Sequence, residues 1–112
     1  MIIEKVILDY LLDNDIAAFA ERPETPPEEY VLIEKTGATE EDLLVTSTIA
    51  FQSYAKTLAN AMLLNEQVKA LIREVDTLPS VSASFLNSDY NFTNPTAKQY
   101  RYQAVFDIVH KE

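Results

Sequence analysis

The spacing of apolar residues changes along this chain of 112 residues, and these changes restrict the folds available to it. Helical spacing of three and four comes first and returns between Lys56 and Val75, where Ser53 or Thr57 is a candidate N-cap. Asn14 is expected to end the first helix in a left-handed conformation. The first helical stripe consists of Ile3, Val6, Ile7, Tyr10 and Leu11. Two amphipathic helices are therefore predicted, each with a face that other elements must cover.

Alternating apolar and polar residues, typical of strands with one buried face, predict strands in most of the remaining chain. Pro23, Pro26 and Pro27 form a rigid loop after the first predicted strand, because proline cannot donate to a ladder. Gly37, the only glycine, is predicted to turn the chain within the acidic segment 37–42, forming a hairpin. The predicted strands are residues 16–22, 29–36, 43–55, 81–85 and 99–109.

These elements follow the order α-β-β-β-α-β-β within a single domain of residues 1–112. Two main helices and a mostly antiparallel sheet of about five strands predict a two-layer α+β domain. The second helix connects the third strand to the fourth. These two strands therefore either run parallel or are separated in the sheet, and the sequence does not choose between the two arrangements.

The formal net charge of −9 is confined to one part of the chain. Residues 1–42 hold twelve acids and three bases, whereas residues 43–112 hold six of each. Such a charge opposes binding to a phosphate backbone and argues against sequence-specific recognition of nucleic acid. The acids can repel DNA that passes without being held, meet a basic protein, or simply maintain solubility.

The chain is expected to be synthesised in the cytoplasm and to be soluble. No cysteine is present, which fits a reducing compartment. The apolar N-terminus carries Glu4, Lys5 and Asp9, lacks a signal-peptide cleavage site, and is too short to span a bilayer. No membrane association is therefore expected.

Residue patterns for catalysis, cofactors or metals are missing. His110 is the only histidine and lies near the C-terminus, where a solvated or strand-end position is expected. Asp89 and Asn91 resemble the start of a calcium loop, but its glycine and closing glutamate are lacking, so a turn capped by these side chains is favoured. No catalytic residue, cofactor or metal ligand is predicted, and an enzyme is not expected.

The polar segment 87–98 is expected to be a long loop between the last two strands. It contains Tyr90 and Phe92, which a merely solvated loop would not require. Aromatic side chains on such a loop are candidates for an interface, because they bury a large area at low entropic cost. The alternative is that both fold back onto the core of their own domain.

Three segments carry a family resemblance: "LNSDYNFTNPTAKQYRYQAVFDIVH", "YVLIEKTG" and "TIAFQSYAKTLANAMLLNEQV". They resemble the tail-terminator proteins, also called tail-completion or head-tail joining proteins, of long-tailed phages and prophages of Gram-positive bacteria. The resemblance covers residues 30–110. It implies a structural virion protein that forms a ring, usually of six copies, on the head-proximal end of the tail. Its partners would be the tail tube protein and the head connector protein, with DNA crossing the lumen.

Two segments are predicted to make the contacts of this assembly. The acidic segment with Glu40, Glu41 and Asp42 is expected to face the lumen or an axial partner. The loop 87–98 is expected to contact a neighbouring subunit or the tail tube through Tyr90 and Phe92. The partner-binding candidates are Asn87, Asp89, Tyr90, Asn91, Phe92, Lys98 and Arg101.

Other functions stay open from sequence alone. The chain could be a head-completion or minor capsid protein of the same neck region, which differs in the end of the neck that it binds. A small acidic domain could also be a DNA mimic that inhibits a nuclease. A mimic needs carboxylates spaced like phosphates along one elongated surface, whereas many acids here are predicted in turns.

Overall fold

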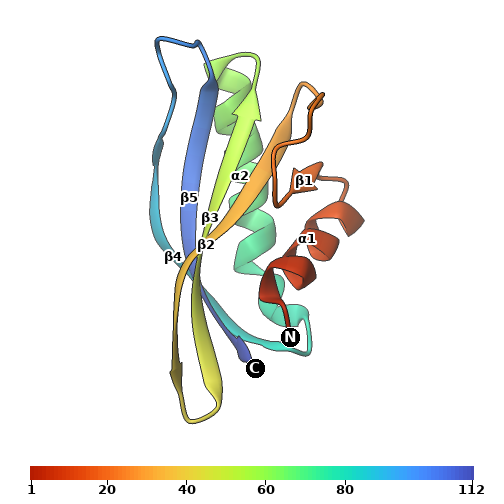
Figure 1. The fold of residues 1–112 in the computed structure, drawn as a ribbon, viewed down its shortest axis with the longest axis vertical. Helices are drawn as coiled ribbons and strands as arrows, with labels where there is room; N and C mark the ends of the chain where they lie inside the picture. Colours follow the sequence, from red (N-terminus) through yellow and green to blue (C-terminus); the bar gives the residue numbers. More distant parts are fainter.

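A computed structural model describes all residues from 1 to 112 and has a helical layer against a single sheet (Figure 1). The predicted α+β class and the order of helices and strands are confirmed. The elements are α1 (Ile3–Asp13), β1 (Ala18–Phe19), β2 (Tyr30–Glu41), β3 (Leu44–Ala55), α2 (Leu58–Arg73), the 3-10 helix η1 (Val75–Thr77), β4 (Val81–Asn91) and β5 (Tyr100–Lys111).

The five strands lie side by side in the order β1-β2-β3-β5-β4. β1 pairs with β2 in parallel, and the other pairs are antiparallel. β3 and β4 are both antiparallel to β5, so they run in the same direction with β5 between them. Both arrangements left open by the sequence therefore occur together: the strands connected by α2 are parallel and separated.

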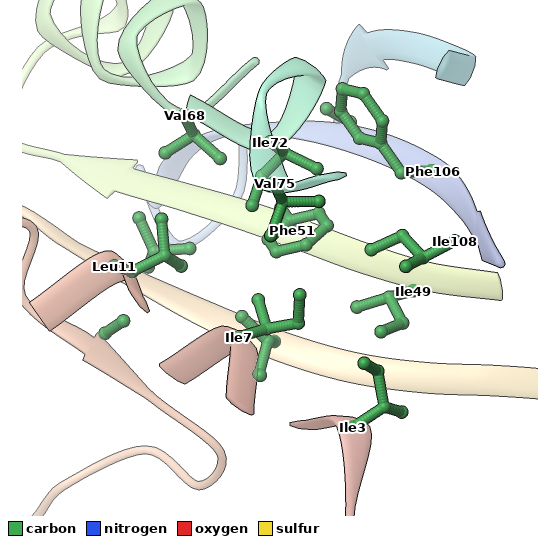
Figure 2. Packing of buried hydrophobic residues seen from close by; sticks show 14 of the residues in the cluster. Ile3, Ile7, Leu11, Ile49, Phe51, Val68, Ile72, Val75, Phe106 and Ile108 are labelled. Carbon is green, nitrogen blue, oxygen red and sulfur yellow. The ribbon is translucent and has the colours of Figure 1, made fainter. Parts of the chain in front are cut away.

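Both helices pack on one face of the sheet and bury their apolar stripes there (Figure 2). Ile3, Ile7 and Leu11 of α1 are fully or almost fully buried. At the centre of the sheet, the rings of Phe51 and Phe106 meet edge to face at 5.9 Å. Burial contributes about 1.5–3 kcal/mol for each large apolar side chain before entropy is counted. The opposite face of the sheet has no covering layer.

The helix boundaries follow local capping chemistry. Thr57, one of the two predicted caps, accepts a hydrogen bond at Oγ1 from the backbone N–H of Asn60 at 3.1 Å. The predicted left-handed stop at Asn14 is wrong, because its φ is −105°. The left-handed residue is Asp15, with φ of 63°. Asn14 instead donates from Nδ2 to the Tyr10 carbonyl at 2.8 Å.

The hairpin turn predicted at Gly37 lies elsewhere. β2 continues to Glu41, and the chain reverses at Asp42 and Leu43, with φ of 52° and 68°. Two-residue loops with both residues at positive φ match the twist of paired strands. Closing the hairpin there preserves the ladder from Gly37 to Glu41 that a turn at Gly37 would remove. Gly37 itself follows a bulge and has no positive φ.

Two other strand predictions have the wrong length. β1 is limited to Ala18–Phe19, since the chain then enters the proline-rich segment and leaves the edge of β2. β4 extends to Asn91 instead of ending near Asn87, because residues 87–91 stay close to β5 and most of them pair with it. The loop expected over residues 87–98 is therefore reduced to residues 92–99.

The molecule is elongated, with extents of 45 × 24 × 24 Å. The turn of the β2–β3 hairpin lies at one end of the long axis, and the β4–β5 turn lies at the other (Figure 1). The first hairpin extends beyond the helices as a free arm.

Candidate partner-binding surface

The predicted aromatic pair lies at the outer end of the β4–β5 hairpin. The rings of Tyr90 and Phe92 are nearly perpendicular with centroids 5.9 Å apart, and the side chains belong to residues that are 41% and 38% exposed. The guanidinium carbon of Arg101 lies 4.3 Å from the Phe92 ring centroid, and Arg101 Nε donates to the Phe92 carbonyl at 2.6 Å. Three predicted partner-binding residues therefore form one cluster, and neither aromatic belongs to the core.

This cluster continues as a row across the whole sheet. Arg101 Nη1 donates to Tyr54 Oη at 2.9 Å, and the Tyr54 ring stacks in parallel on Tyr30 at 4.7 Å. Tyr30 meets Phe19 edge to face at 6.3 Å. We call this set the aromatic row; its members, in strand order, are Phe19, Tyr30, Tyr54, Arg101, Phe92 and Tyr90.

The aromatic row lies on the face of the sheet that the helices leave uncovered. Tyr30, Tyr54 and Arg101 are register partners, and side chains alternate between the two faces of a strand. Val31, the neighbour of Tyr30, belongs to the core on the opposite face. The row is therefore built by register, which aligns residues from distant parts of the sequence.

A row of hydrogen-bonded polar side chains lies next to the aromatic row and orders the same face of the sheet. Gln52 Nε2 donates to Gln103 Oε1 at 2.9 Å, and Gln103 Nε2 donates to the Tyr90 hydroxyl. Tyr54 Oη donates to Gln52 Oε1 at 3.2 Å. Because these side chains bond to one another, the face is ordered before any partner arrives, which reduces the entropic cost of binding.

Asp89, another predicted partner-binding residue, points to the helical side. Its carboxylate accepts from Lys69 Nζ at 2.5 Å and from Asn65 Nδ2 at 2.8 Å. Lys69 Nζ also lies 2.9 Å from Glu66 Oε2. The hydrogen bonds from Lys69 to Asp89 and then to Glu66 raise the lysine pKa above its ordinary value, against the effect of burial. Asp89 therefore joins β4 to α2, and the predicted turn cap at this residue is wrong.

The other polar candidates lie at different places on the hairpin. Asn87 donates to Asp107 Oδ2 at 3.0 Å and thus binds within the chain. Asn91 Oδ1 accepts from the Thr93 backbone N–H at 3.0 Å, which is the predicted turn-capping role. Lys98 lies in the loop with φ of 51° and has no carboxylate within 4.0 Å.

Beside the aromatic row is a shallow pocket of about 300 Å³, which we call the cationic pocket. Cations from three separate segments contribute to it: Arg22, Lys56 and Lys98. Tyr30 and Tyr100 also line it. Burial raises the pKa of Tyr30, and the nearby Arg22 guanidinium opposes that rise. The sequence did not predict this pocket, because only the fold brings Arg22 and Lys56 close to Lys98.

The predicted acidic residues lie at the opposite end of the molecule. Glu40, Glu41 and Asp42 are all exposed at the end of the β2–β3 hairpin. Leu43 and Leu44 follow directly and are 78% and 41% exposed. The end of this hairpin, residues 40–44, is called the acidic tip below. The two leucines were missed because the sequence placed them inside a buried strand.

One pair of side chains has the geometry of a nucleophile and a base, but it is enclosed in the fold. Ser47 Oγ lies 2.8 Å from His110 Nε2, and both residues are buried. In the neutral ring, Nδ1 donates to the Lys111 carbonyl at 2.7 Å, so Nε2 accepts from the serine hydroxyl. The pair joins β3 to β5 beneath the helices. His110 is therefore a buried residue near the end of β5, so of the two expected positions the strand end is confirmed and the solvated one is wrong.

No cluster of three or more side chains suited to a metal ion occurs, and neither helix has the length and apolar composition needed to cross a bilayer. The chain matches no protein-family model and no curated protein sequence.

Proposed function

We propose that this chain is a structural protein of the tail-terminator type, which forms a ring of six copies at the head-proximal end of a phage tail. In this role it acts by binding alone. It stops growth of the tail tube and presents a surface to the head connector protein, while DNA crosses the lumen. It is assembled in the host cytoplasm and stays in the virion.

One observation carries this proposal. The longest segment that resembles the family, residues 86–110, forms the β4–β5 hairpin, which presents the half-exposed Tyr90 and Phe92 on an ordered face. Rigid aromatic side chains with a neighbouring arginine are typical of the residues that dominate binding energy at interfaces. The surface thus fits contact with a neighbouring subunit or with the tail tube.

The acidic tip has a place in the same proposal. Carboxylates that project from a ring into its lumen repel passing DNA, which lowers the friction of ejection. An assembled ring with the acids of residues 21–42 on its outer rim would refute this role of the charge.

The first test locates the protein on tail tubes. Purified protein with a gold label is mixed with tubes of its phage and imaged by negative-stain electron microscopy. We expect label at one end of each tube and none along the shaft. Label on heads alone would favour a head-completion protein, and inhibition of a nuclease without tube binding would favour a DNA mimic.

The second test addresses the aromatic pair. Replacing both Tyr90 and Phe92 by alanine is expected to weaken tube capping by at least about tenfold, or about 1.4 kcal/mol. Phe85 provides a matched control, because it is an exposed aromatic on the same strand (59%) that makes no aromatic-row contact. Capping by the double variant at the level of the Phe85→Ala control, with both variants folded by circular dichroism, would contradict the assignment.

A further inference from the structure

The cationic pocket holds positive charge that the chain does not neutralise. Lys56 pairs with Glu28 at 3.2 Å, but Arg22 and Lys98 have no carboxylate within 4.0 Å. Arg101, whose guanidinium reaches Tyr54 on the pocket wall, is also free of an ion pair. Acids outnumber bases eighteen to nine in this chain, so unpaired cations gathered at one place require an explanation.

The acidic tip combines strain with exposure. Leu43 is 78% exposed and has φ of 68°, a conformation that costs a residue with a side chain about 1–2 kcal/mol. Glycine is the favoured residue at the second position of such a turn. Leucine at this position stabilises neither the turn nor the core. An apolar contact outside the monomer would account for it.

We propose that the acidic tip of one copy docks into the cationic pocket of the next copy. Glu40, Glu41 and Asp42 would neutralise Arg22 and Lys98, and Leu43 would pack against Tyr100, the tyrosine of the pocket that is only half-buried. The inference rests on the proposed function, in which copies assemble into a ring, and it names the contact between neighbours. Such a contact joins unlike surfaces, so its repetition closes a ring when the rotation between copies is suitable.

A second copy fits the pocket better than a nucleic acid does. The tip is narrow and convex, supplies both carboxylates and an apolar side chain, and belongs to the same chain. The acidic tip lies at one end of a molecule 45 Å long, and the β4–β5 turn lies at the other end (Figure 1). This turn contributes Lys98 and Gln99 to the pocket, so the tip and the pocket cannot meet within one copy.

The absence of cysteine allows a direct test by disulfide cross-linking. Leu43→Cys is mixed with a size-tagged Gln99→Cys variant under mild oxidation, because Gln99 lines the pocket. A disulfide needs Cα atoms about 4.4–6.8 Å apart, so a mixed dimer reports the proposed contact. We expect mixed dimers and few homodimers of either variant. Gln67→Cys, at an exposed glutamine of α2, is the matched control and should not link to Leu43→Cys.

Charge reversal tests the chemistry of the contact. Changing Arg22 and Lys98 to glutamate in the Gln99→Cys variant should lower the mixed-dimer yield about tenfold. Changing Glu40, Glu41 and Asp42 to lysine in the Leu43→Cys variant should have a similar effect. Combining both reversals should restore the yield. If reversal leaves the mixed-dimer yield unchanged, or if the pocket cations are needed to bind a DNA oligonucleotide instead, the proposed contact is wrong.

Cross-linking is carried out both with concentrated free protein and on tail tubes. Capped tubes without a Leu43–Gln99 link would refute this contact and leave the tail-terminator function standing. Leu43–Gln99 links in solution without capping of tubes would support this contact and refute the tail-terminator function. If mixed dimers form in neither sample, the proposed contact is wrong. A double variant carrying Leu43→Cys and Gln99→Cys should give a ladder whose largest band counts the copies in the ring.

Discussion

At Gly37 the backbone does not use the freedom that glycine provides. Its φ is not positive, and a methyl group added there would meet no atom within 4 Å. Alanine restricts the unfolded chain more than glycine does, so Gly37→Ala should raise the free energy of unfolding by about 0.5–1 kcal/mol. Thermal denaturation checks this value. A lower melting temperature would mean that the bulge beside Gly37 requires glycine.

Leu43 has the opposite property, since a residue with a side chain occupies a position that favours glycine. Leu43→Gly should raise the free energy of unfolding of the monomer by about 1 kcal/mol, because Asp-Gly is a preferred pair for this turn. Urea denaturation measures the change. Leu44→Gly is the control, because Leu44 already belongs to β3 and glycine weakens a strand. A loss of stability in both variants would show that Leu43 stabilises the monomer.

These two residues show why the turn was misplaced from sequence. Glycine marks a position where positive φ costs nothing, but hairpins close where pairing of both strands continues longest. Residues 38–41 are small or polar and give no apolar alternation, so the sequence offered no sign that they belong to a strand. Only their register with residues 44–47 identifies them as one.

At the scale of elements, Lys69 and Asp89 connect α2 to the outer strand β4. Lys69 is the cation that pairs with the Asp89 carboxylate. Lys69→Met leaves this carboxylate without its partner and should lower the free energy of unfolding by about 1–3 kcal/mol. Urea denaturation near neutral pH checks this value. Glu66→Gln is the control, because the Glu66 side chain is 65% exposed and its ion pair contributes little.

The Lys69–Asp89 pair also makes the free energy of unfolding depend on pH in the alkaline range. The folded-state pKa of Lys69 is raised above 10.5, so its contribution is complete below the unfolded pKa and is lost as pH rises through the folded pKa. The difference in unfolding free energy between wild type and Lys69→Met should therefore be constant up to the ordinary lysine pKa of about 10.5 and shrink as the pH rises above it. Burial also raises the pKa of Tyr10, but this affects both proteins equally. A constant difference over this range would contradict the role of Lys69.

The helices and the central strands could be predicted because each has one apolar face. Residues 87–91 could not, since both of their faces carry polar groups that bind specific partners within the chain. The candidate partner-binding surface could be predicted only in part, because some of its residues come together only in the folded sheet. Tyr90, Phe92 and Arg101 are near one another in sequence or across one hairpin, whereas Tyr30, Tyr54 and Arg22 join them only through the register of the whole sheet.

At the scale of the whole molecule, salt should act in opposite directions on folding and on assembly. The excess of acids in residues 1–42 repels itself in the folded chain, so added salt should raise the melting temperature of the monomer. The same screening should lower the mixed-dimer yield of the tip and pocket variants. Over one series of sodium chloride concentrations, calorimetry measures the melting temperature and cross-linking measures the mixed-dimer yield. A parallel rise in both would mean that apolar burial, and not charge, dominates the contact.

The order of the strands also has a consequence for synthesis. β5 is the last element of the chain, yet it lies between β3 and β4 and supplies Phe106 and Ile108 to the core. Until β5 leaves the ribosome, β4 has no partner in the sheet and the centre of the core is missing. The domain therefore folds only after β5 has been translated. Nascent chains on one messenger RNA therefore cannot dock through folded domains until β5 of each has emerged from the ribosome.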